Sequence, residues 1–206
     1  MKITAARRAF AAVDVDDMER RLLMRLFADT AALLVAEDGG ADDEPGTQGG
    51  GAHDEEAARL ERLVGLASGE RPEDPAVLRL LPDAAPDDPE RAAEFRRLTE
   101  RDLREGKLAN LRIALHGLAG TGRIELTEEE ARAWLTALTD VRLVIATRLE
   151  LVSDDDLERL YDRGDDLDDN TAAMVSVYDF LTWAQERLSE IMLDALDARP
   201  SGGGPA

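Results

Sequence analysis

The segment from residue 128 to 151 constrains the fold more than any other part of the chain. Its apolar side chains recur at spacings of three and four residues, in the series Trp134, Leu138, Val141, Ile145 and Leu149. Residues at these spacings share one face of an α-helix. Further apolar residues, among them Leu135 and Val144, fall outside this stripe. We therefore predict a helix that is buried on most of its circumference and forms the centre of the domain.

The composition supports a mainly α-helical fold. Hydrophobic residues make up 44% of the 206 residues, but aromatic residues only 4%. The core is therefore expected to be aliphatic. Ala, Leu, Arg and Glu, which dominate the sequence, all favour helices. We predict one compact domain of about five to six helices over residues 1–198.

Local signals locate the helix ends. Asp14 and Asp88 are predicted N-caps, and Pro89 suits the first position of a helix. Thr127 and Glu130 form the pattern of a capping box. Two short helices are expected to carry Leu60 to Ala67 and Leu157 to Tyr161, and one or two helical turns are expected over 75–81. The longer helices are expected to cover 15–36, 89–117, 128–151 and 171–197. The core stripe predicted for the last helix is Met174, Val177, Tyr178, Leu181, Leu188, Met192 and Leu196.

Two short apolar runs, 9–13 and 122–126, are candidate strands, and we expect them to pair into a small two-stranded β-ribbon. Residues 37–56 contain eight acidic residues, six glycines and no Lys or Arg. Such a segment cannot bury enough apolar surface to order itself, so we predict a disordered insertion there. The tail at 199–206 is also predicted to be disordered.

The charge balance limits the classes of partner. The chain has 45 acidic and 25 basic residues, for a formal net charge of −20. Such a surface repels nucleic-acid phosphates and anionic membranes and favours basic partners. The sequence shows no signal peptide and no stretch of about 20 apolar residues that could span a membrane. A cytoplasmic protein is therefore expected.

Catalytic signatures do not appear in the sequence. The two histidines, His53 and His116, are isolated, and there is no cysteine. Disulfides, thiolate metal sites and thiol redox chemistry are therefore excluded within this chain. An EF-hand calcium loop starting at Asp166 fails, because Thr171 and Val177 occupy the positions that require Gly and Glu. We expect a non-enzymatic protein without catalytic, cofactor-binding or metal-binding residues.

Residues 91–112 carry seven basic and four acidic side chains, which is unusual in so acidic a chain. Arg97, Arg101 and Arg104 recur at helical spacing and form one candidate partner-binding face. Pairs such as Glu100–Arg104 neutralise much of this positive charge, and each pair stabilises the helix by about 0.2–0.5 kcal/mol. A solvated helix face is therefore the favoured interpretation, and direct DNA binding by the helix at 96–112 is the alternative.

Three further groups of residues are candidates for specific roles. The acidic residues Asp154, Asp155 and Asp156 form a candidate surface for a basic partner. Arg142 and Arg148 flank the central apolar stripe, so each is expected to form a structural ion pair, for which Asp140, Asp179 and Glu186 are available. Phe180 and Trp183 lie off the main stripe of the last helix and are a candidate homodimer surface.

Three segments carry a resemblance to a known family: EDPAVLRLLPDAAPDDPERAAEFRRLTERDLREGKLANL, LTEEEARAWLTALTDVRLVIATRLEL and VYDFLTWAQERL. The chain resembles an actinobacterial family of unknown function, some of whose members are named oxidative-stress transcriptional regulator AosR. The resemblance covers nearly all of the chain apart from 37–56 and the tail. It implies a regulator linked to transcription, and the family's genes often lie near the gene of a Clp protease adaptor.

Family members that are thought to sense redox do so through cysteines, which this chain lacks. The methionines that could be oxidised instead are interpreted as core-filling residues: Met18, Met24, Met174 and Met192. We therefore expect a regulator without a thiol switch that contacts a protein partner, with a sigma factor or RNA polymerase as candidates. The alternatives are a direct DNA binder and an adaptor in Clp-linked proteolysis.

Overall fold

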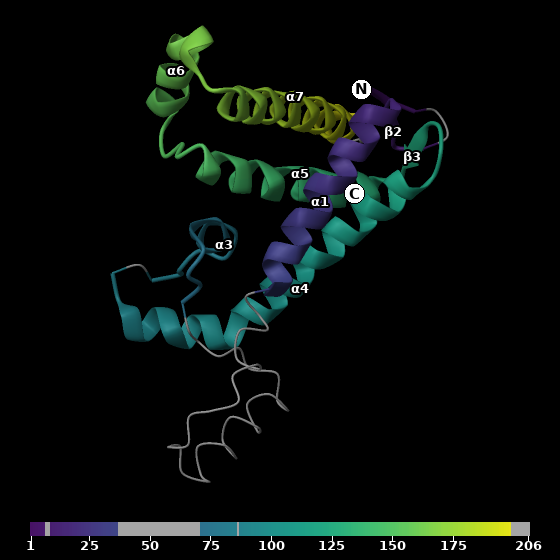
Figure 1. Cartoon of the computed structure of the whole chain (residues 1–206). Coiled ribbons are helices and arrows are strands. Elements are labelled where there is room, and N and C mark those ends of the chain that lie inside the picture. The colour runs from purple at the N-terminus through teal and green to yellow at the C-terminus, as the bar shows by residue number, and fades with distance from the viewer. Residues whose placement is uncertain (7–8, 37–70, 86, 199–206) are drawn as a thin grey trace, which may run out of the picture.

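The computed structural model describes residues 1–6, 9–36, 71–85 and 87–198, apart from the side chains of Asp154 and Asp165 (Figure 1). This part of the chain contains six α-helices, one short 3-10 helix and a three-stranded sheet. The fold is mainly α with a small β element, as the sequence predicts. The predicted insertion at 37–56, the helix expected near Leu60 and the tail at 199–206 lie outside the described residues.

Helix α5, Glu128–Arg148, is the central element, as predicted. It contacts α4, α7, α3 and α1 as well as strand β3. Its Trp134 is fully buried and meets Phe27 of α1 edge to face, with the ring centroids 5.9 Å apart. The apolar stripe read from the sequence therefore lies in the middle of the core.

Helices α1, Asp17–Ala36, and α4, Pro89–Ala119, pack against each other and against α5. Figure 1 shows that α4 bends, so that its first half lies near α3, Pro75–Leu80, and its second half lies along α1. The predicted start of α4 is confirmed, because the Asp88 side chain accepts a hydrogen bond from the Arg91 amide at 3.1 Å. The capping box of Thr127 and Glu130 is confirmed as well.

The sheet joins two distant parts of the chain. Strand β2, Ala11–Asp14, pairs antiparallel with β3, Ile124–Leu126, as the predicted ribbon requires. A third strand, β1, Lys2–Ala5, adds to the other edge of β2 and was missed by the sequence analysis. A four-residue strand in which only Ile3 is buried gives too short an alternation to recognise.

Helix α6, Asp154–Arg163, the 3-10 helix Gly164–Asp166 and helix α7, Asp169–Asp197, complete the fold. The stripe predicted for α7 is correct only in part. The buried residues are Val175, Leu181, Ala184, Leu188 and Ile191. Leu196 is 51% exposed, because at about 100° per residue it lies roughly 140° around the helix from Ile191.

The interpretation of the methionines as core-filling residues is wrong for two of them. Met18 is 69% exposed and Met24 is 36% exposed, both on α1. The buried face of α1 is instead made by Leu23, Phe27, Thr30 and Leu34. Among the residues that the structure describes, no helix has the length and apolarity that crossing a membrane requires.

Candidate functional site

Arg104 is a structural residue and does not belong to the basic face predicted for α4. Its side chain is buried, and it donates one hydrogen bond to the Leu34 carbonyl of α1 and another to Glu100 at 2.6 Å. The Leu34 carbonyl belongs to the last turn of α1, where carbonyls lack helical partners. Arg104 therefore caps α1, and a partner cannot reach it on the surface.

Arg20 makes the reciprocal contact from α1 to α4. Its guanidinium donates to the carbonyls of Leu118, Gly120 and Gly122 at 2.8, 2.7 and 2.6 Å. A cation at a helix C-terminus also interacts favourably with the helix dipole. Arg20 and Arg104 thus join opposite ends of the antiparallel pair α1 and α4. The role of Arg20 was not predictable from the sequence, because its acceptors lie about 100 residues away along the chain.

A second pair of arginines attaches α3 to the end of α5. Arg148 bonds to Asp74 at 2.6 Å, and this bond is the main reason why the pKa of Asp74 lies below its ordinary value. Arg79 donates to the Leu151 carbonyl at 2.8 Å. Arg148 therefore forms an ion pair as predicted, but with Asp74, which was not among the expected partners.

Asp140 pairs with Lys107 of α4, at 2.6 Å, and not with Arg142 or Arg148. Asp140 is only 1% exposed, and its second carboxylate oxygen, Oδ2, accepts no hydrogen bond. Burial raises the pKa of Asp140, although the contact with Lys107 acts in the opposite direction. This pair is a polar contact within the interface between α4 and α5.

Arg142 uses neutral partners in place of the predicted carboxylate. It donates to Gln185 at 2.7 Å and to the Tyr178 hydroxyl at 3.2 Å. Its guanidinium carbon also lies 5.1 Å from the centre of the Tyr178 ring, within range of a cation–π contact. Arg142 therefore links α5 to α7, but the ion pair predicted for it with Asp140, Asp179 or Glu186 is absent from the contacts between described residues.

Asp156 and Asp179, both predicted site residues, are engaged locally. Asp156 accepts hydrogen bonds from the Ser153 amide at 2.7 Å and from Arg159 at 2.8 Å, which completes the cap of α6. Its pKa is lowered chiefly by the bond from the Ser153 side chain. Asp179 accepts a hydrogen bond from the hydroxyl of Tyr161, and this bond raises the pKa of Tyr161 to about 12.

Asp155 is exposed, and the backbone of Asp154 begins α6. The three aspartates therefore do not form one uniform binding surface, since Asp156 serves the helix cap.

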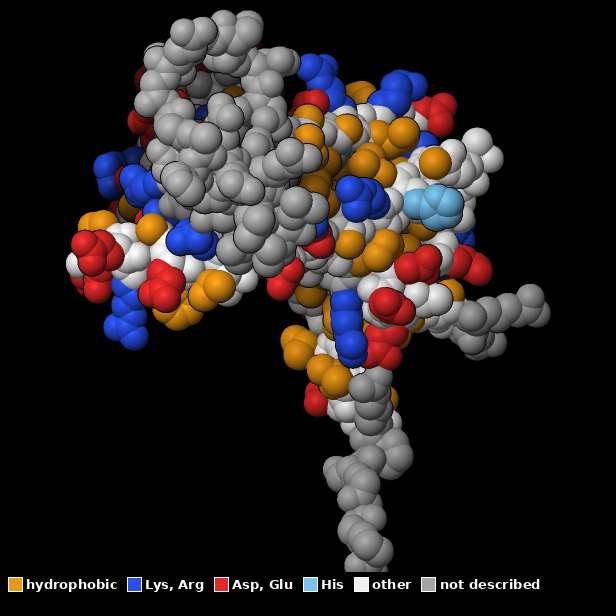
Figure 2. Space-filling model, turned by 90° about the horizontal axis from the view of Figure 1, so that it is seen from below, with side chains coloured by type: hydrophobic (Ala, Val, Ile, Leu, Met, Phe, Trp, Pro, Cys, Tyr) orange, Lys and Arg blue, Asp and Glu red, His pale blue; other side chains and the backbone are white. Residues whose placement is uncertain are grey.

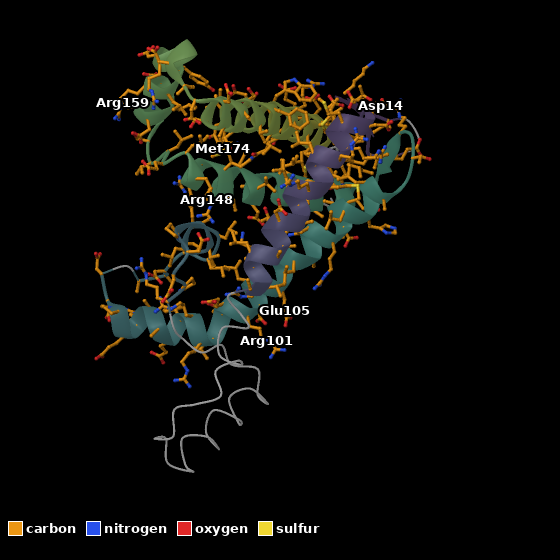
Figure 3. All side chains as sticks on the ribbon, viewed as in Figure 1. Asp14, Arg101, Glu105, Arg148, Arg159 and Met174 are labelled. Atoms are coloured by element: carbon orange, nitrogen blue, oxygen red, sulfur yellow. The ribbon has the colours of Figure 1, made fainter. Side chains whose placement is uncertain are left out.

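The basic side chains of α4 divide into built-in and exposed groups. Arg96 bonds to Asp83, and Arg104 and Lys107 bond to Glu100 and Asp140, so these three cations are committed to the fold. Arg97 and Arg101 are exposed, and Arg101 lies 2.9 Å from Glu105 (Figure 3). Three of the seven basic residues are therefore structural contacts, and the other four, Arg91, Arg97, Arg101 and Arg112, are exposed. On the face seen in Figure 2, Lys and Arg side chains are interspersed with acidic and apolar ones.

Phe180 and Trp183 do not form one apolar patch. Phe180 is half-buried and packs against the main core, whereas Trp183 is 37% exposed. In the part of the chain that the structure describes, no group of three or more His, Cys, Asp or Glu residues is arranged to hold a metal ion. His116 is exposed near the end of α4.

Comparisons with known proteins identify relatives over most of the chain. A family model described as a domain of unknown function, DUF2017, matches residues 1–192. The chain is 34% identical over 154 residues to the oxidative stress regulator AosR of Mycobacterium tuberculosis H37Rv, which covers 65% of this chain and 66% of that protein. It is 36% identical over 108 residues to a protein of Mycobacterium leprae named putative oxidative stress regulator AosR, covering 45% of this chain and 50% of that protein.

The aligned segments thus span between half and about two thirds of the length of these relatives. No solved structure is significantly similar to the chain. The relatives' names support a regulatory role. Since the family model covers the chain from its first strand into its last helix, the protein belongs to the DUF2017 family.

Proposed function

We propose that this protein is a non-enzymatic cytoplasmic regulator of the oxidative-stress response that acts on transcription through contacts with other proteins. The observation that carries the proposal is its relationship to proteins named oxidative stress regulator, at 34% identity over 154 residues. A sigma factor or RNA polymerase is the proposed partner.

Electrostatics favours a protein partner over DNA. The formal net charge of −20 repels phosphate backbones, and binding to DNA depends on neutralising phosphates with Lys and Arg. Arg96, Arg104 and Lys107 of α4 are already bonded to carboxylates of the fold. On the segment 96–112 that the DNA-binding alternative uses, Arg97, Arg101 and Arg112 remain exposed.

The proposed mechanism does not use a thiol switch, because the chain of 206 residues contains no cysteine. An oxidative signal then reaches transcription through a change in the partner, or in the amount of this protein. Both routes require a binding surface and no reaction centre on this chain.

Affinity purification of the full chain from its native host, with and without peroxide, tests the proposal. We expect RNA polymerase or a sigma factor to be recovered and identified by mass spectrometry. Recovery of Clp components without transcription proteins would favour the adaptor alternative and contradict the proposal.

A separate measurement addresses the DNA-binding alternative. Gel-shift assays with promoter fragments should show no binding at physiological salt. If binding is seen and the double variant Arg97→Glu/Arg101→Glu abolishes it, the protein is a direct DNA binder. Arg104 is left intact in this variant, because its replacement would disturb the fold.

A further inference from the structure

The outer face of α7 carries a continuous exposed stripe along most of the helix. The stripe consists of Asp179, Trp183, Glu186, Glu190, Leu193 and Asp197, at successive spacings of four, three, four, three and four residues. All six residues are exposed. This alternation keeps side chains on one side of a helix and is the spacing by which two packed helices meet. We call these six residues the α7 stripe.

The α7 stripe points away from the core. Most residues that bury α7 against the rest of the molecule lie on the other side of the helix: Leu181, Ala184, Leu188 and Ile191. Val175 lies four residues before Asp179, on the side of the stripe, and is buried in a cluster with Leu151 and Leu160. The described elements that pack on α7 most extensively are α5 and β1. Figure 1 shows α7 as an outer layer, with α5 on its inner side. The described part of the chain thus leaves the stripe uncovered from Trp183 to Asp197, while Tyr161 of α6 contacts its first residue, Asp179.

The chemistry of the stripe is mixed, with apolar side chains set between carboxylates. Trp183 is 37% exposed and Leu193 is 60% exposed, and four acidic residues alternate with them. Tryptophan is enriched at the energetic centres of protein interfaces, where it buries a large area. The stripe covers 18 residue steps, or about 27 Å at 1.5 Å per residue. This length suits a partner helix of about five turns.

A second copy of this chain is a poor occupant for the stripe. A two-fold dimer would place the same patch against itself, so the four carboxylates would face four carboxylates. Like charges opposed across an interface cost several kcal/mol and suppress such pairing. The net charge of −20 on each molecule adds to this repulsion. The charge pattern therefore argues against the homodimer suggested by Phe180 and Trp183.

We propose that the α7 stripe is a docking site for a basic amphipathic helix of another protein. Apolar residues of that helix pack on Trp183 and Leu193, and its Lys and Arg side chains pair with Glu186 and Asp197. Glu190 already forms an ion pair with Arg187 of α7, so it contributes mainly charge. The carboxylate of Asp179 already accepts the Tyr161 hydroxyl and contributes mainly charge. The inference rests on the proposed function, since it names the surface through which a protein partner is bound.

A designed peptide provides the probe for binding. It has 18 residues, with Leu at the positions that face Trp183 and Leu193 and Lys at the positions that face the carboxylates. A twin peptide carries Glu in place of each Lys. Titration calorimetry with the full chain, in about 50 mM salt where exposed charges are weakly screened, should detect the basic peptide alone.

Two charge-reversal variants separate a local site from overall charge. Glu186→Lys/Glu190→Lys changes the stripe, whereas Glu94→Lys/Glu125→Lys makes the same change in net charge at exposed residues of α4 and β3. We expect the first variant to weaken peptide binding at least about tenfold and the second less than about threefold, because close charge pairs outweigh distant ones. Equal weakening by both variants would overturn the proposal.

Tryptophan fluorescence reports whether the peptide lies on the stripe. The chain has two tryptophans, of which Trp134 is fully buried and Trp183 is exposed. Acrylamide should quench mainly Trp183, which the variant Trp183→Phe identifies by difference. Bound peptide should protect Trp183 from quenching. Binding that leaves its quenching unchanged would place the peptide elsewhere and reject the stripe as the site.

Purification from the host distinguishes failure of this inference from failure of the proposed function. If the wild-type chain recovers a transcription protein and Glu186→Lys/Glu190→Lys loses it, both are supported. If both chains recover it equally, the stripe is rejected and the proposed function stands. If neither recovers one, the proposed function fails, and the peptide titrations alone decide whether the stripe binds a basic helix.

Discussion

Single arginine side chains hold the ends of helices in this protein, and Arg104 is the most buried of them. It links the Leu34 carbonyl at the end of α1 to Glu100 of its own helix. A buried guanidinium is tolerated only when its donors are used, because unpaired charge is costly to bury. The residue is therefore expected to contribute more to stability than the exposed arginines on the same helix.

Replacing Arg104 by Ala should lower the free energy of unfolding by about 1–3 kcal/mol, since it leaves a buried carbonyl and a carboxylate without their donor. Arg112→Ala is the matched control, because Arg112 is exposed on the same helix. Its effect should stay within about 0.5 kcal/mol. Urea denaturation followed by circular dichroism measures both, and equal effects would show that Arg104 is not a structural residue.

The Asp140 carboxylate should make stability depend on pH in a defined direction. Burial raises its pKa in the folded state above the ordinary value of 3.8, so the folded protein binds more protons than the unfolded chain between these two values. The contribution of Asp140 to stability therefore falls as pH rises through this interval.

Asp140→Asn cannot ionise, so its stability relative to the wild type should improve as pH rises from about 3.8. Denaturation curves of both proteins between acidic and neutral pH give this difference. A constant difference would mean that the bond to Lys107 cancels the effect of burial, and a difference that moves against the variant would mean that this bond outweighs it. Asp155→Asn, at an exposed residue, serves as the control.

At the scale of the elements, α1 and α4 are secured at both ends of their contact by arginines from the opposite helix. The Arg20 guanidinium donates hydrogen bonds to the carbonyl of Leu118, in the last turn of α4, and to those of Gly120 and Gly122, which follow the helix. Gly122 has a φ of +82°, which glycine adopts without strain. The turn that leads from α4 into β3 therefore depends on both residues.

Arg20→Ala should release the end of α4 and the turn into β3, because three carbonyls lose a charged donor. Hydrogen exchange measured by mass spectrometry should become faster in peptides that cover 115–123. Peptides from the centre of α5 should change little. Arg21→Ala, at the exposed neighbouring position, should leave both regions unchanged. Uniformly faster exchange would instead indicate global destabilisation.

The separation along the sequence between contacting residues explains which elements were predictable. Thr127 and Glu130 form a capping box within three residues, so the sequence pattern contains the whole contact. The start of α4 at Asp88 and the central role of α5 follow from similarly local signals. Arg20 and Gly120 are 100 residues apart, and no local pattern relates them.

The candidate sites were less predictable for the same reason. Arg104 shares its helical spacing with Arg97 and Arg101, but it is buried and bonds to the Leu34 carbonyl of α1, which the spacing does not reveal. The partners chosen by Arg142 and Arg148 depend on how α7 and α3 pack against α5. The residue types on one helix thus indicated that polar contacts would form there. Which side chains form them depends on how the helices pack against one another.

At the scale of the whole molecule, the excess of 45 acidic over 25 basic residues dominates the electrostatics. A net charge far from zero destabilises a compact state through self-repulsion. Ion pairs oppose this, but several are exposed, such as Arg25–Asp29 and Arg132–Glu128, and exposed pairs contribute at most about 1 kcal/mol each. Repulsion among the carboxylates should therefore outweigh the surface pairs.

Added salt should accordingly stabilise the protein. We expect the melting temperature to rise by several degrees between about 10 and 300 mM NaCl, because the Debye length falls from about 30 Å to less than 8 Å. The control is Glu94→Lys/Glu125→Lys, whose formal net charge of −16 should raise the melting temperature at low salt and reduce its salt dependence. Calorimetry of both proteins tests this, and a melting temperature that falls with salt would mean that ion pairs stabilise the fold more than the net charge opposes it.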